Sequence, residues 1–126
     1  MNFPDHLKYT REHEWIRVEG GEGVIGITDF AQKALGDIVF VDIDTEGETL
    51  AAGERFGTVE AVKTVSDLYM PIGGKVIAVN TTLEIAPETV NKDPYGEGWM
   101  IRIQTDNSAD PDDLMSSAEY EEFANS

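Results

Sequence analysis

Short β-forming runs separated by glycine-marked turns restrict the fold of this chain more than any other feature. The runs are rich in Val, Ile and aromatic residues and occupy residues 15–19, 23–27, 38–43, 56–62, 65–70, 75–79 and 99–103. Strands this short, with a turn signal after each one, are typical of two packed sheets or of a barrel. The sequence therefore predicts a mostly β fold, a sandwich or flattened barrel.

Two segments interrupt the strand pattern and are expected to be helical. Thr28 can cap a short inserted helix over residues 29–35, and Gly36 is placed to end it. Ser117 can cap a C-terminal helix over residues 118–123, in which Tyr120 and Phe123 share one face. No linker divides the chain, so residues 1–126 are expected to form one domain, with a core at about 14–104 and a C-terminal helical segment at about 110–124.

The charge balance excludes some classes of partner. The chain has 25 Asp and Glu residues against 9 Lys and Arg residues, a net charge of −16. Such a field repels phosphate backbones, so nucleic-acid binding is not expected. The acidity is compatible with high solubility, with attraction to basic docking surfaces on partner proteins, and with a salty habitat. Composition does not separate these three explanations.

Few residues are available for catalysis or metal binding. The chain has no cysteine, which excludes a disulfide framework and a thiolate site. It has only two histidines, which are few for a histidine metal site or a catalytic triad. We therefore expect no metal and no enzyme activity in the chain itself. The N-terminal residues lack a signal-peptide pattern and no run approaches the roughly 18 apolar residues of a membrane span, so a cytoplasmic location is expected.

Two segments match ligand-binding motifs in part, but the residues around them do not fit those motifs. Residues 21–26 match the spacing of a dinucleotide-binding loop, but a β-branched run follows where that motif needs a helix. A hairpin turn explains these glycines. The acidic run that begins at Asp42 resembles a calcium loop, but Gly53 stands where the loop needs a bidentate Glu.

Lys63 is the remaining candidate for a functional group. It is the only basic residue between Arg55 and Lys75, and it lies between two strand-like runs. A lysine at the tip of a hairpin presents its amine to solvent, where a modifying enzyme can reach it. In an arbitrary protein the better explanation would be an ordinary solvated turn lysine.

The sequence around Lys63 resembles the attachment hairpin of biotinyl and lipoyl carrier domains. Pro71, Gly74 and Val76 stand at the places expected after the modified lysine. Biotin carriers set the lysine between two methionines, whereas Val62 and Thr64 flank it here. Glu60, three residues before the lysine, resembles the acidic residue that marks lipoyl hairpins for lipoylation. The resemblance thus implies a lipoyl-domain fold with lipoate attached covalently to Lys63.

The resemblance extends over about residues 7–124 and is specific to the glycine cleavage H-protein family. Generic lipoyl domains of 2-oxoacid dehydrogenases lack both the helix after Ile27 and the C-terminal helix. The segments that carry the likeness are residues 13–15, 26–31, 35–41, 60–63 and 94–100. Small departures from the family pattern at Met70 and at Gly73-Gly74 lie outside the attachment site.

Membership of this family would imply a carrier function. The lipoyl arm would take an aminomethyl group from a pyridoxal-phosphate glycine decarboxylase and deliver it to a folate-dependent aminomethyltransferase. Dihydrolipoamide dehydrogenase would reoxidise the dithiol, and a lipoate-attaching enzyme would load the arm. Two alternatives stay open: a relay that passes lipoate or octanoate from Lys63 to other lipoyl domains, and an unmodified β module that acts only as a binding scaffold.

Two carboxylates match the family pattern for a cleft that shelters the aminomethyl cargo. Glu14 lies beside His13, and Asp67 follows Lys63 by four residues. Carboxylates around a partly dry cleft would hold a cationic amine by charge-assisted hydrogen bonds. The competing explanation is that Glu14 is an exposed strand residue and Asp67 a turn residue that binds backbone amides.

Overall fold

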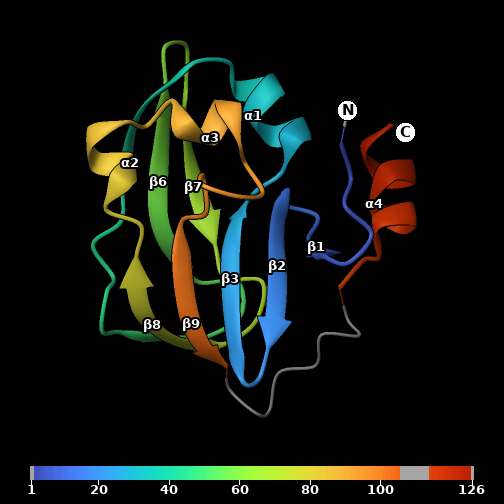
Figure 1. The fold of residues 1–126 in the computed structure, drawn as a ribbon, viewed down its shortest axis with the longest axis vertical. Helices are drawn as coiled ribbons and strands as arrows, with labels where there is room; N and C mark the ends of the chain where they lie inside the picture. Colours follow the sequence, from blue (N-terminus) through green and yellow to red (C-terminus); the bar gives the residue numbers. More distant parts are fainter. Residues whose placement is uncertain (1, 106–113, 126) are drawn as a thin grey trace.

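A computed structural model describes residues 2–105 and 114–125 of the chain, and these form two antiparallel β-sheets with short helices at their edges (Figure 1). The larger sheet has the order β1 (Lys8–Tyr9), β2 (Glu14–Glu19), β3 (Glu22–Ile27), β9 (Ile101–Thr105), β8 (Gly74–Val79) and β5 (Thr49–Leu50). The smaller sheet has the order β4 (Ile38–Asp42), β6 (Arg55–Ala61) and β7 (Val65–Tyr69).

One hydrophobic core joins the two sheets. Its buried side chains include Ile25 and Ile103 from the larger sheet and Val59 and Leu68 from the smaller one. Both sheets turn one face toward this core, which is the pattern of a sandwich. The mostly β fold class is therefore confirmed, and the two sheets do not close into one barrel.

The inserted helix forms where the sequence predicted it. Helix α1 (Asp29–Leu35) begins after Thr28, whose side-chain oxygen accepts a hydrogen bond from the Ala31 N–H at 3.1 Å. Gly36 ends the helix with a φ of 81°, and its N–H donates to the Gln32 carbonyl at 2.9 Å. A left-handed residue after the last helical turn favours glycine, since glycine has no Cβ to strain.

The C-terminal helix requires a correction of one residue at its cap. Helix α4 (Ser117–Ala124) is capped by Ser116, not by Ser117. The Ser116 hydroxyl accepts from the Glu119 N–H, and the Glu119 carboxylate accepts from the Ser116 N–H, so the cap is the reciprocal Ser-x-x-Glu box. The expected start of the helical segment at about residue 110 lies outside the described residues.

Helix α4 packs beside β1 and the N-terminal segment (Figure 1). The Tyr120 ring stacks on Tyr9 with centroids 4.7 Å apart, and both side chains are fully buried. Trp15 and Leu7 belong to the same cluster. This second, aromatic core fixes the C-terminal helix against the strand that begins at Glu14.

Several short elements were not predicted from the sequence. Helices α2 (Thr82–Ile85) and α3 (Thr89–Lys92) are single turns, and strands β1 and β5 have two residues each. Elements this short contain too few residues to show a period. The last core strand begins at Ile101 and not at Trp99, whose N–H closes a turn on the Gly96 carbonyl at 3.1 Å. In the described ranges we find no helix long and apolar enough to cross a membrane.

Candidate functional site

Lys63 lies at the tip of the β6–β7 hairpin, which projects from one end of the molecule (Figure 1). The Ala61 N–H donates to the Thr64 carbonyl at 2.8 Å, so Val62 and Lys63 are the central residues of a tight turn. The Val62 N–H donates to the Asp37 carbonyl at 3.1 Å, which ties the tip to the segment before β4. The backbone under Lys63 is therefore held from two sides.

The Lys63 side chain itself is exposed. Within residues 2–105 and 114–125, no carboxylate lies close enough to pair with its amine. An open hollow of about 370 Å³ lies beside it, between the tip and the end of α1, and is lined by Lys33, Ala34, Leu35, Gly36, Asp37, Val62 and Lys63. A held backbone and a free amine suit a residue that another protein must acylate.

Glu60 is exposed on the same hairpin, three residues before Lys63. It pairs with Phe40 on β4 and with Val65 on β7. Directly paired residues of antiparallel strands point to the same face of the sheet. Glu60 is therefore near the tip and open to solvent, as its predicted part in lipoylation requires.

The second half of the site is the turn between β1 and β2. The Thr10 N–H donates to the Glu14 carbonyl at 2.9 Å, and the Thr10 hydroxyl oxygen accepts from the backbone N–H groups of Glu12 and Glu14. His13 has a φ of 67°, the only positive φ among the described residues other than glycine. Such a conformation strains an L residue and persists only where the surroundings enforce it.

Glu14, at the end of this turn, is buried, with 1% of its surface exposed. Its Oε1 accepts from the Thr10 hydroxyl at 2.9 Å, and its Oε2 accepts from the Tyr69 N–H at 3.2 Å. Burial is the largest influence and raises the pKa of Glu14 to about 8, although both hydrogen bonds pull it downwards. Glu14 is thus no ordinary exposed strand residue, and its carboxyl is mostly protonated at neutral pH.

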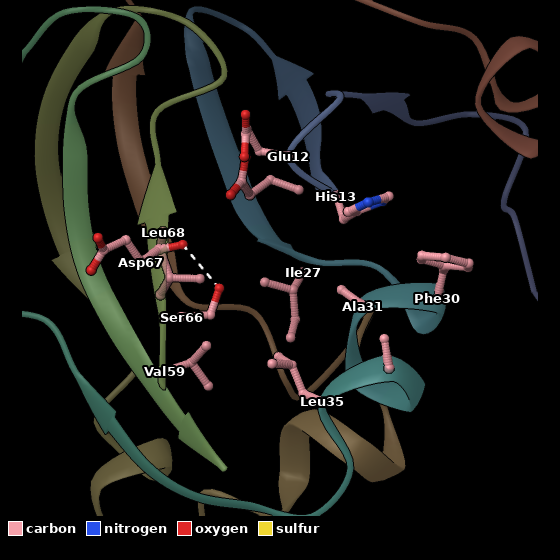
Figure 2. Close-up of a pocket in the computed structure, with 12 residues that line it drawn as sticks. Glu12, His13, Ile27, Phe30, Ala31, Leu35, Val59, Ser66, Asp67 and Leu68 are labelled. Atoms are coloured by element: carbon pink, nitrogen blue, oxygen red, sulfur yellow. Dashed lines mark hydrogen bonds between the residues drawn. The ribbon is translucent and has the colours of Figure 1, made fainter. Parts of the chain in front are cut away.

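Glu14 lies against a cavity of about 180 Å³ between the two sheets and α1 (Figure 2). The strands and the helix turn apolar side chains toward this space. The lining comprises Glu12, His13, Glu14, Ile27, Phe30, Ala31, Ala34, Leu35, Val59, Ser66, Asp67 and Leu68. A carboxyl group at the edge of a largely apolar cavity can bind a small organic group that ends in an amine.

Asp67 lies at the same cavity, but its carboxylate points away from it (Figure 2). It is paired with Thr58, whereas the neighbouring Leu68 is buried in the core. The Tyr69 hydroxyl stands 3.5 Å from Asp67 Oδ2 on that outer face. The structure therefore brings Glu14 and the backbone of Asp67 to one cavity and leaves their two carboxylates on different sides of β7.

A network around His13 was missed by sequence reasoning. His13 Nδ1 lies 2.8 Å from the Tyr120 hydroxyl, which lies 2.7 Å from the Thr28 hydroxyl. The His13 ring also packs on Phe30 with centroids 4.8 Å apart, and burial lowers the pKa of His13. Helix α4 thereby contacts both the strained turn and the start of α1, two walls of the cavity. The residue pairs are too distant in sequence for any local pattern to reveal them.

The donor set limits what the site can bind. No three acidic or histidine side chains in the described ranges stand close enough to hold a metal ion. The groups that stand out are the exposed Lys63 amine and the buried Glu14 carboxyl, which adjoins a cavity lined mainly by apolar side chains. This set fits a covalently attached arm whose far end is stored in the cavity.

Comparisons with known proteins agree over nearly the whole length. The family model described as glycine cleavage H-protein matches residues 7–126. The glycine cleavage system H proteins of Bacteroides fragilis and Salinibacter ruber are 60% and 57% identical, over 99% and 97% of this chain and 99% and 98% of theirs. The crystal structure of a glycine cleavage system H protein from Mycobacterium marinum superposes with a TM-score of 0.88 at 40% identity, covering 98% of this chain and 99% of that one.

Proposed function

This chain belongs to the glycine cleavage H-protein family, and from that premise we propose that it carries lipoate on Lys63 as the mobile arm of the glycine cleavage system. The observation that supports the assignment is the pairing of an exposed lysine at a held hairpin tip with a cavity beside the same hairpin. The protein acts as a carrier in this proposal, and the reactions belong to the enzymes it visits.

Attachment of the arm uses the free amine of Lys63. Its neutral Nζ attacks the carbonyl carbon of an activated lipoyl group, such as an acyl adenylate, supplied by a lipoate-attaching enzyme. A C–N amide bond forms, the bond to the activating group breaks, and the nitrogen loses one proton to solvent while the other stays in the amide N–H. Because no carboxylate pairs with Lys63 in the described ranges, no ion pair must break first.

Lipoate bound to Lys63 would supply a disulfide that can accept an aminomethyl group from a glycine decarboxylase. An aminomethyltransferase would then remove the carbon, and dihydrolipoamide dehydrogenase would reoxidise the dithiol that is left. The chain contributes a tether, which raises the effective concentration of the arm at each partner. The relay of lipoate to other proteins and the cytoplasmic location stay predictions.

The cavity lies within reach of a tethered arm. Ser66, which lines it, follows Lys63 by three residues, or about 10 Å along an extended strand. An arm folded back along β7 from the tip would meet this cavity. The lysine loses its charge on acylation, so the arm can lie on apolar side chains without desolvating an ammonium group.

Glu14 is the residue that we propose holds the amine at the end of the loaded arm. An arriving cation favours the ionised carboxylate, so the proton held by the buried Glu14 would leave as the amine binds. The hydrogen bonds from Thr10 and Tyr69 keep the carboxyl oriented. Asp67 stays a prediction for the same task, because its carboxylate must change rotamer to face the cavity.

The attachment site is tested by Lys63→Arg, with Lys33→Arg as the matched control beside the same hollow. Both proteins are produced in the native cell and their intact masses are measured. We expect Lys33→Arg to carry one lipoyl group per chain and Lys63→Arg to carry none, with both proteins folded. A lipoyl group on Lys63→Arg protein would overturn the assignment.

The part of Glu14 is tested on purified, loaded carrier in the absence of partner enzymes. Loss of a charge-assisted hydrogen bond, about 1.5–3 kcal/mol, corresponds to a roughly ten- to hundredfold change in the sheltered population. Glu14→Ala should therefore accept lipoate normally and release ammonia faster, whereas the exposed control Glu84→Ala should not. Equal release rates for the two variants would remove Glu14 from the mechanism.

A further inference from the structure

Exposed apolar side chains gather around the proposed attachment site. Of the seven large hydrophobic residues that the described ranges leave exposed, four lie on the small sheet or its hairpin tip: Val39, Phe40, Val62 and Val65. Phe40 is 49% exposed and Val65 59% exposed. Apolar side chains that gather on one part of a surface can mark an interaction site.

The strand register places two of these residues, Phe40 and Val65, in one row. Phe40 pairs with Glu60, and Glu60 pairs with Val65, so the three side chains stand side by side across β4, β6 and β7. An irregularity in the pairing between Ile38 and Phe40 breaks the alternation of β4, which is why both Val39 and Phe40 face solvent. The row therefore consists of two apolar side chains, Phe40 and Val65, with the Glu60 carboxylate between them.

This row lies on the opposite face of the sheet from the cavity. Val41 and Val59, one position away from Phe40 and Glu60, are buried in the core. The next row on the outer side contains Asp42, Thr58 and Asp67. We call the side chains of Phe40, Glu60, Val65, Asp42 and Asp67 the outer face. Its two apolar side chains flank Glu60 in the row near Lys63, and its two Asp side chains lie in the row farther from the tip.

We propose that the outer face is the docking surface for the lipoate-attaching enzyme, which would meet it with an apolar spot bordered by basic side chains. This inference rests on the proposed function of Lys63. Phe40 and Val65 would provide the dry centre of the contact. Glu60, Asp42 and Asp67 would pair with the basic side chains and fix the register of docking.

The length of the bare lysine favours this occupant over the enzymes that use the finished arm. The Lys63 amine reaches only roughly 6 Å from its Cα, across five bonds of about 1.5 Å. An enzyme that acylates this amine must therefore cover the tip and the side chains next to it. Enzymes that react with the far end of the lipoyl arm can dock at a distance. Glu60 and Val65, three and two residues from Lys63 along the hairpin, therefore suit the first contact.

The outer face also leaves the cavity free. The attaching enzyme would lie on one side of the small sheet, and after its release the arm would fold to the cavity on the other side. In this arrangement the Asp67 carboxylate serves recognition in its observed position and needs no change of rotamer.

The test compares lipoylation of full-length unmodified protein by its own lipoate-attaching enzyme, supplied with lipoate and ATP. Phe40→Ser should lower kcat/KM for lipoylation about tenfold, mainly through a higher KM, because a central aromatic contact is lost. Val65→Ser should act in the same direction. Val18→Ser is the matched control, since Val18 is 41% exposed on β2 in the other sheet, and should leave kcat/KM unchanged.

A second measurement separates docking from reactivity of the amine. Acylation of Lys63 by a small amine-reactive ester, read by peptide mass spectrometry, should be equally fast in Phe40→Ser and unmutated protein. Unchanged enzymatic kcat/KM in Phe40→Ser, with the unmutated chain lipoylated on Lys63, would overturn this inference and leave the proposed function standing. The inference would also be overturned if Phe40→Ser changed only self-association or only the reaction with the glycine decarboxylase. An unmutated chain that is never lipoylated on Lys63 would overturn both.

Discussion

The two hairpin turns at the candidate site differ in how their side chains are packed. The turn between β1 and β2, residues 10–13 with Glu14 at its end, is packed and hydrogen-bonded, and its His13 is strained at a φ of 67°. The turn between β6 and β7, residues 62–64, is exposed, and its backbone avoids the left-handed region. We call them the packed turn and the open turn.

The difference follows from what each turn must present. A lysine that another protein acylates needs a fixed backbone and a free side chain, which two hydrogen bonds at Ala61 and Val62 supply. A buried carboxyl needs neighbours that satisfy its oxygens, which Thr10 and Tyr69 supply at Glu14. Changes in the packed turn should therefore alter stability strongly, and changes in the open turn should not.

The largest expected effect is the pH dependence contributed by Glu14. Its pKa is about 8 in the folded chain against an ordinary value of 4.5, so below that ordinary value it is protonated in both states. As the pH rises toward 8, the unfolded chain loses this proton while the folded chain keeps it. Each pH unit between the ordinary pKa and the folded pKa then lowers the free energy of unfolding by about 1.4 kcal/mol, or by about 4–5 kcal/mol over the whole range.

Glu14→Gln removes this contribution. The free energy of unfolding, measured with denaturant between about pH 5 and pH 8, should fall more steeply for the unmutated chain than for Glu14→Gln. The difference between the two curves isolates Glu14 from the other carboxylates. Parallel curves would show that the pKa of Glu14 is not raised in the folded chain.

Tyr120→Ala should have the next largest effect. The ring is fully buried, stacks on Tyr9, and places its hydroxyl 2.8 Å from His13 Nδ1. Removing a buried aromatic side chain costs about 3–4 kcal/mol. Tyr120→Phe keeps the ring and loses only the hydroxyl, so it should lose about 1 kcal/mol and serves as the control. Equal losses for the two variants would mean that the hydroxyl network and not the packing holds α4.

Sequence reasoning recovered the open turn better than the packed turn. The open turn could be predicted because two long strand runs flank it and the residues around Lys63 match a known pattern locally. The packed turn depends on contacts between residues far apart in the chain, such as His13 with Tyr120 and Glu14 with Tyr69. The raised pKa of Glu14 is likewise a product of burial, which the local sequence does not encode.

The same contrast explains the errors in the fold. Core strands such as β3 and β6 have six and seven residues and contain β-branched side chains, and they were predicted to within a residue or so. Helices α2 and α3 are single turns held by their surroundings and show no period. At α4 the Ser-x-x-Glu spacing from Ser116 to Glu119 was present in the sequence and should have decided the cap.

Thr10→Val sharpens the comparison at a single hydroxyl. The side chain keeps its shape but can no longer accept from the N–H groups of Glu12 and Glu14 or donate to the Glu14 carboxyl. Unsatisfied groups in a partly buried turn should cost about 2 kcal/mol. Denaturant unfolding measures this loss, and the exposed Thr64→Val in the open turn is the matched control. A loss as small as that of the control would mean that water replaces the Thr10 hydroxyl.

The smallest expected effect is that of Val62→Ser in the open turn. Val62 is 70% exposed, and the hydrogen bond that holds it comes from its backbone N–H to the Asp37 carbonyl, which the substitution leaves in place. Surface changes away from packing and capping stay within about 0.5 kcal/mol, so the free energy of unfolding should be unchanged within that margin. Thermal or denaturant unfolding of Val62→Ser beside the unmutated chain measures it. A loss as large as that of Thr10→Val would break the comparison, because the side chains of the open turn would then hold the fold as those of the packed turn do.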